Sequence, residues 1–137
     1  MLRLPLRQSQ VLALLATVCV VGMLEDATSA RQNKRDFSVT ARKYAFSVSG
    51  SPSPEIRVQQ DDIVEITFAA DDIPHSFTIV NDDHYRISKR AEPGRPINFS
   101  FRADQPGTFS IKCTLPSDDK CKEMSATLVV VGRTSKR

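Results

Sequence analysis

The feature that most constrains this chain is an alternation of apolar and polar residues that begins at Val39 and continues almost to the C-terminus. Successive side chains of a strand point to opposite faces, so this period of two is typical of half-buried strands, and no stretch of a dozen residues keeps a helical period. The clearest run holds Ile97, Phe99 and Phe101. The other alternating runs cover residues 44–48, 56–58, 64–68, 75–79, 109–113 and 124–130. Turn residues separate the runs, which predicts an all-β, Greek-key sandwich or barrel of about seven or eight strands.

The first thirty residues have a different pattern. Arg3 and Arg7 precede an apolar run from Val11 to Leu24, and small residues follow it. This order of basic head, apolar middle and small-residue end is typical of a secretory signal. Because fourteen residues are short for a hydrocarbon layer of about 30 Å, we expect an exported protein, periplasmic or extracellular. An uncleaved N-terminal membrane anchor is the alternative.

The length of 137 residues has room for one ordinary domain. We expect a signal peptide at 1–30, a basic linker at 31–37, the folded domain at 38–132 and a basic tail at 133–137. Without residues 1–30 the chain keeps seventeen Lys or Arg (19 − 2) and fourteen Asp or Glu (16 − 2), a formal charge of +3. This balance is too mild to indicate nucleic-acid binding, and we expect a monomer.

Four residues with soft donor atoms stand out in the predicted domain. Removal of the signal takes away Cys19 and leaves Cys113 and Cys121, which in an oxidising compartment form either a disulfide or a metal site. The alternation places His75, Cys113 and Met124 on buried faces of three strands, each beside a loop, and the loop at 114–122 brings Cys121 close to Met124. One imidazole, two potential thiolates and a thioether favour copper, Cu(I) above all, over zinc, which is poorly served by Met.

At these residues the chain resembles a known family, the cupredoxin superfamily. The likeness is strongest to the copper domains of cytochrome c oxidase subunit II and nitrous oxide reductase, and to related cupredoxin-like domains of exported bacterial proteins. It extends over residues 38–131. The motifs that carry it are Pro74-His75-Ser76-Phe77, Pro93-Gly94, Pro106-Gly107, Cys113, and Met124 followed by an apolar strand.

The resemblance implies one mononuclear copper ion bound by His75, Cys113, Cys121 and Met124. Ser117 stands where the binuclear members have a second Cys, which argues against a two-copper centre, and Cys121 stands where the family has its second His. The function implied is electron transfer or copper handling, not catalysis, with a redox partner protein or a membrane-bound oxidase as partner.

The alternative is a metal-free interaction or accessory domain in which Cys113 and Cys121 form a disulfide. In the chain-entropy model, closing a loop of about nine residues stabilises the fold by roughly 2 to 3 kcal/mol. The residues alone leave the choice between metal and disulfide open.

The remaining polar residues indicate no further site. His84 lies in a polar turn, matches no family position and is interpreted as exposed. We interpret the Asp-Asp pairs that begin at 61, 71, 82 and 118 as solvated turns, since Asp is a common turn residue and none has calcium-loop spacing. No nucleophile elbow, phosphate-binding glycine loop or His-Glu-x-x-His helix is present, so no enzyme activity is predicted.

Overall fold

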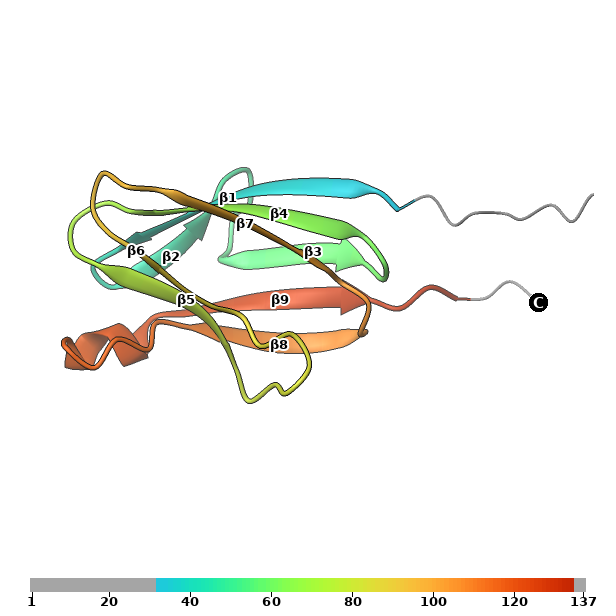
Figure 1. Cartoon of the computed structure of the whole chain (residues 1–137). Helices are drawn as coiled ribbons and strands as arrows, with labels where there is room; N and C mark the ends of the chain where they lie inside the picture. Colours follow the sequence, from blue (N-terminus) through green and yellow to red (C-terminus); the bar gives the residue numbers. More distant parts are fainter. Residues whose placement is uncertain (1–31, 135–137) are drawn as a thin grey trace, which may run out of the picture.

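The computed structural model describes residues 32–134, so the predicted signal peptide and the last three residues lie outside the described part. Within it the chain forms a two-layered sandwich of β-strands with one short 3-10 helix (Figure 1). The elements are β1 (Lys34–Arg42), β2 (Ala45–Val48), β3 (Glu55–Gln59), β4 (Ile63–Ala70), β5 (His75–Val80), β6 (Ser88–Ala91), β7 (Ile97–Arg102), β8 (Gly107–Lys112), η1 (Asp119–Glu123) and β9 (Ser125–Val131). The prediction of an all-β sandwich is confirmed.

The strands form two sheets, with the orders β2-β1-β4-β7 and β3-β9-β8-β5-β6. The β1–β4 and β3–β9 pairs are parallel, and the other pairs are antiparallel. Residues 32–134 form nine strands instead of about seven or eight, because β1 and β6 add to the seven alternating runs of the sequence. Strand β1 starts at Lys34 within the segment that we assigned to a linker, since Lys34 to Phe37 pair with Ile63 to Ile66 of β4.

The core forms as the alternation predicts. Phe68 is fully buried at its centre, with its ring centroid 6.4 Å from that of Phe46 and 5.9 Å from that of Phe77. Phe99 packs against Phe77 at 5.3 Å but is only half-buried, because its strand β7 is an edge of the four-stranded sheet. Burial of these apolar side chains is the main favourable contribution to folding.

The candidate residues meet at one end of the sandwich. His75 begins β5, Cys113 directly follows β8, and Met124 directly precedes β9, and these three strands are neighbours in the order β9-β8-β5. Figure 1 shows η1 at this end, opposite the end where the described chain begins and finishes. No helix among residues 32–134 is long and apolar enough to cross a membrane.

The segment predicted as a polar loop contains the 3-10 helix η1. Its start is fixed by Asp118, whose side chain accepts a hydrogen bond from the backbone N–H of Lys120 at 3.0 Å. Side-chain capping of this kind satisfies an N–H group that the helix itself leaves without a partner. The turn places Cys121 on its inner side, where the residue is buried.

Candidate functional site

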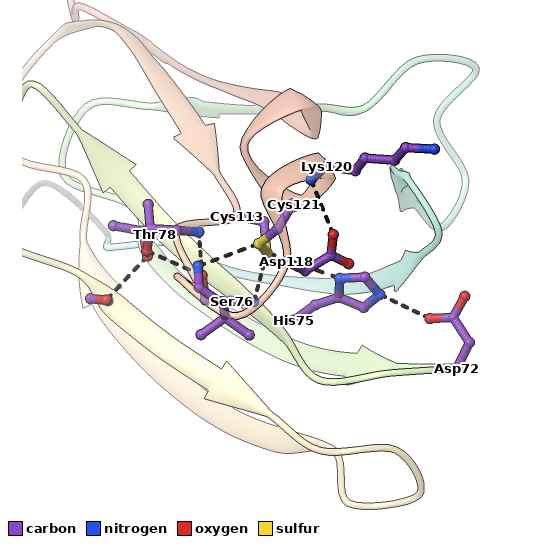
Figure 2. Close-up of a disulfide and its surroundings, with 11 residues drawn as sticks. Asp72, His75, Ser76, Thr78, Cys113, Asp118, Lys120 and Cys121 are labelled. Carbon is purple, nitrogen blue, oxygen red and sulfur yellow. Dashed lines mark hydrogen bonds and ion pairs between the residues drawn. A yellow bond between two sulfur atoms is a disulfide. The ribbon is translucent and has the colours of Figure 1, made fainter.

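Cys113 and Cys121 are joined by a disulfide (Figure 2). Their Cα atoms are 5.1 Å apart, within the range that a disulfide requires. Both residues are only 1% exposed, so solvent hardly reaches the bridge. Of the two alternatives that the sequence leaves open for this cysteine pair, the structure contains the disulfide.

Each sulfur accepts a hydrogen bond from a backbone amide. The N–H of Ser76 donates to Cys113 Sγ at 3.4 Å, and the N–H of Leu115 donates to Cys121 Sγ at 3.3 Å. The N–H of Thr114 donates in turn to Ser76 Oγ at 2.8 Å. The two bonds of Ser76 join the start of β5 to the residues that follow β8, and they fix the position of Cys113.

A row of hydroxyl groups strengthens the same junction. Thr114 Oγ1 lies 3.3 Å from Ser76 Oγ and 3.0 Å from Thr78 Oγ1, and Thr78 Oγ1 lies 3.1 Å from Ser88 Oγ. The row therefore links β6, β5 and the residue after Cys113. Sequence reasoning did not identify it, because the contacts connect residues far apart in the chain.

His75 lies beside the disulfide and is completely buried. Its Nδ1 is 4.0 Å from Cys113 Sγ, and its Nε2 is 2.9 Å from Asp72 Oδ1 (Figure 2). A carboxylate can only accept, so in the neutral ring Nε2 carries the proton and donates a hydrogen bond to Asp72. The unprotonated Nδ1 then faces the sulfur.

Asp72 is the site residue that sequence reasoning missed, since we interpreted it as part of a solvated turn. Its carboxylate accepts hydrogen bonds from the backbone N–H groups of Lys43 and Ile73, both at 2.8 Å, as well as from His75. Desolvation alone raises the pKa of Asp72, but the bonds from Lys43, His75 and Ile73 outweigh it and hold that pKa well below its usual value. An Asp three residues before a buried His was the available signal.

Tyr44 comes from the turn between β1 and β2 and contacts the η1 turn. The Nζ atom of Lys120 lies 5.4 Å from the centroid of its ring. Desolvation, together with the nearby carboxylate of Asp118, raises the pKa of Tyr44. This contact joins the segment that carries Cys121 to the opposite sheet.

Met124 completes the set predicted from the sequence. It is 1% exposed, and its backbone N–H donates to the carbonyl of Cys121 at 3.1 Å. The structure thus brings His75 and Cys113 into contact and bonds Cys121 to Cys113.

Across residues 32–134, no group of three or more His, Cys, Asp and Glu side chains has an arrangement suited to holding a metal ion.

Comparisons with known proteins bear on the fold. No family model and no curated protein matches the sequence. Among solved structures, auracyanin A, a "blue" copper protein from Chloroflexus aurantiacus, is similar with a TM-score of 0.58 and 18% identity over 72% of this chain and 99% of that one. The chain has the cupredoxin fold.

Two further structures extend this cupredoxin likeness. A chain of a heme-copper terminal oxidase dimer gives a TM-score of 0.62 at 18% identity over 74% of this chain and 66% of that chain. The mixed disulfide intermediate between a thioredoxin-like protein and subunit II of cytochrome c oxidase gives a TM-score of 0.57 at 18% identity, over 72% of this chain and 82% of that chain. This chain therefore spans about two thirds of the oxidase chain.

The donor atoms decide how well this site suits copper. A disulfide sulfur carries no negative charge, whereas thiolates are the ligands that bind copper strongly, so the disulfide form does not fit the metal. In the dithiol form His75 Nδ1, two thiolates and the Met124 thioether are a donor set suited to Cu(I). Asp72 would fix the tautomer and orientation of the imidazole, as outer carboxylates do for metal-bound His.

The other histidine lies away from this site. The His84 side chain is 44% exposed, as predicted, and its Nε2 lies 2.6 Å from Asp104 Oδ1. The hydrogen bond from His84 lowers the pKa of Asp104. His84 also packs edge-on against Tyr85, with the ring centroids 4.9 Å apart.

Proposed function

We propose that this chain is an exported cupredoxin-like protein for copper handling, whose cysteine pair alternates between two states. The Cys113–Cys121 disulfide excludes copper, and the dithiol takes up one copper ion as Cu(I) through both thiolates, His75 and Met124. The observation that carries the proposal is the disulfide itself, with Cys113 Sγ 4.0 Å from His75 Nδ1. The disulfide joins the two sulfurs that would bind copper as thiolates, so its reduction creates the copper site.

This arrangement favours copper handling over electron transfer. Two thiolates favour Cu(I) over Cu(II), whereas an electron carrier needs a site that serves both oxidation states. The amide donors of Ser76 and Leu115 belong to the backbone, so they are available to thiolates as well as to the disulfide. A thiolate that accepts such hydrogen bonds is stabilised in its charged form.

The partner that we propose is a dithiol protein that reduces the bridge, acting beside a membrane-bound oxidase. The fold likeness to subunit II in its mixed disulfide with a thioredoxin-like protein supports a partner of this class. Export, which depends on residues 1–30 outside the described part, would place the chain in the compartment where disulfides persist. The domain limits, with the signal peptide at 1–30 and the basic tail at 133–137, are part of the same proposal.

The test compares the oxidised and reduced protein in metal titrations. The full chain with Cys19→Ser leaves only Cys113 and Cys121, so free thiols report on this pair alone. We expect no free thiols and no copper binding before reduction, and two thiols and one tightly bound Cu(I) after it. Cys121→Ser and His75→Ala are expected to weaken Cu(I) binding, whereas His84→Ala serves as the matched control.

The disulfide also favours a second candidate function, the metal-free accessory domain. In that case the reduced protein binds no Cu(I), and the bridge acts as a structural cross-link. Absence of tight Cu(I) binding by the fully reduced, folded protein would therefore refute copper handling and leave the accessory domain.

A further inference from the structure

The disulfide has a structured cover. Residues Leu115 to Glu123, here called the cover segment, lie between β8 and β9 and include η1. Both cysteines are 1% exposed, with Cys121 on the buried side of the segment itself. A reductant must form an in-line contact with one sulfur, so it cannot reach the bridge while the segment is closed.

The two cysteines are held very differently. Cys113 is fixed to β5 through the amide of Ser76 and the adjoining bonds of Thr114 to Ser76 and Thr78. Cys121 belongs to η1, and the backbone hydrogen bonds described for residues 116–123 are local, such as Cys121 N–H to the Asp118 carbonyl at 3.1 Å. In the described part of the chain, none of these bonds reaches another strand. The rest of the cover segment can therefore shift around Cys121, whose sulfur stays tied to Cys113 by the disulfide.

Tyr44, from the side of the opposite sheet, holds the cover segment at η1. The ring of Tyr44 lies under the ammonium group of Lys120 at 5.4 Å from the ring centroid. The two residues come from the β1–β2 turn and from η1, so the contact breaks when the cover segment lifts. A cation over an aromatic face at an exposed position gives a modest stabilisation, which suits a contact that opens reversibly.

We propose that the cover segment opens to admit a dithiol partner to Cys121 Sγ, and that the Tyr44–Lys120 contact sets how often it opens. This inference rests on the proposed function, because it assumes that the bridge is reduced in use. The disulfide keeps the two sulfurs together until exchange, but opening uncovers Cys121 Sγ, which belongs to η1, whereas Cys113 Sγ stays packed beside His75. Cys121 is therefore the sulfur attacked, and Cys113 is the leaving group.

Reduction of the bridge is a thiol–disulfide exchange in two steps. A thiolate of the partner attacks Cys121 Sγ, the Cys113–Cys121 bond breaks, and its electron pair leaves on Cys113 Sγ. The partner's second thiolate then attacks its own sulfur in the mixed disulfide and releases Cys121. The partner is oxidised from dithiol to disulfide, two electrons pass to the cysteine pair, and the two protons of the dithiol end on Cys113 and Cys121 or in solvent.

The test measures how fast dithiothreitol reduces the bridge in the folded, full-length Cys19→Ser protein, followed by thiol trapping and mass spectrometry. Lys120→Met removes the charge and keeps the length of the side chain. Since exposed cation–aromatic contacts give about 0.5–1 kcal/mol, reduction is expected to be about 2- to 5-fold faster. Lys122→Met is the matched control, with the same change in the same segment, and is expected to leave the rate unchanged.

Two further measurements make the outcome decisive. The free energy of unfolding is determined for each variant, because reduction through global unfolding would make the rates follow overall stability. Glutathione, a monothiol, is used to trap the mixed disulfide, which is expected at Cys121. Equal rates for Lys120→Met and Lys122→Met, or a mixed disulfide found at Cys113, would overturn the proposal. No copper is present, so a failure here is distinct from a failure to bind Cu(I).

Discussion

Reduction of the Cys113–Cys121 disulfide is expected to lower the free energy of unfolding by about 2.6 kcal/mol. The bridge joins residues with a sequence separation of 8, which closes a loop of nine residues counting both ends. In the chain-entropy model, a loop of that size loses about 9 cal/mol/K in the unfolded chain, or about 2.6 kcal/mol at 25 °C. The folded state loses little else, because the amides of Ser76 and Leu115 remain available to the two thiols.

The assay is urea unfolding followed by far-UV circular dichroism, with and without a phosphine reductant, in the Cys19→Ser chain. With a urea dependence of about 1–3 kcal/mol/M for a small domain, the midpoint is expected to fall by about 0.9–2.6 M. The Cys113→Ser/Cys121→Ser variant controls for effects of the reductant and should show no shift. A decrease below about 1 kcal/mol, with reduction verified and the slope unchanged, would refute the argument from loop entropy.

Three further substitutions test other parts of the structure. Phe68→Ala is expected to cost about 3–5 kcal/mol in urea unfolding, because the fully buried ring leaves a cavity at the centre of the core; a loss under 1 kcal/mol would contradict this. Asp62→Ala removes the acceptor of the Gln59 N–H, 3.0 Å from Asp62 Oδ2, and is expected to cost about 1–3 kcal/mol and to speed hydrogen exchange at that amide. Asp72→Asn tests pH dependence. In the folded state the pKa of Asp72 lies below its ordinary value of 3.8. The ionised carboxylate therefore stabilises the fold above about pH 4, and this stabilisation is lost as the pH falls toward the folded-state pKa. The destabilisation by Asp72→Asn is therefore expected at about pH 6 and should shrink below about pH 4; a difference independent of pH would contradict it.

Much of the fold could be predicted because strand alternation is a local property. The alternation of apolar and polar residues alone placed His75, Cys113 and Met124 on buried faces, and all three are at most 1% exposed. Alternation does not say which strands are neighbours. The expectation that these three residues lie together at one end of the sandwich therefore came from the family resemblance. The parallel pairing of β1 with β4 was missed for the same reason, since its partner lies more than twenty residues away.

Turn residues were the least predictable part. Asp61-Asp62 and Asp71-Asp72 have the same composition, and both were interpreted as solvated turns. In the structure Asp62 is completely buried, whereas the Asp72 side chain is 28% exposed and bonds to His75. What a turn carboxylate contacts depends on the backbone it meets after folding, which local sequence does not specify.

The pairing of the two cysteines shows the same limit at the site itself. Cys113 follows an alternating strand, so the alternation assigns it to a buried face, but Cys121 lies in a segment without periodicity. Its position depends on the η1 turn, which Asp118 caps and which brings the two Cα atoms to 5.1 Å. That distance permits a bond without requiring one, and the amide donors to the sulfurs are part of the backbone, not of the bridge. The fold is therefore compatible with both the disulfide and the dithiol, and the redox potential of the surroundings decides which of the two forms.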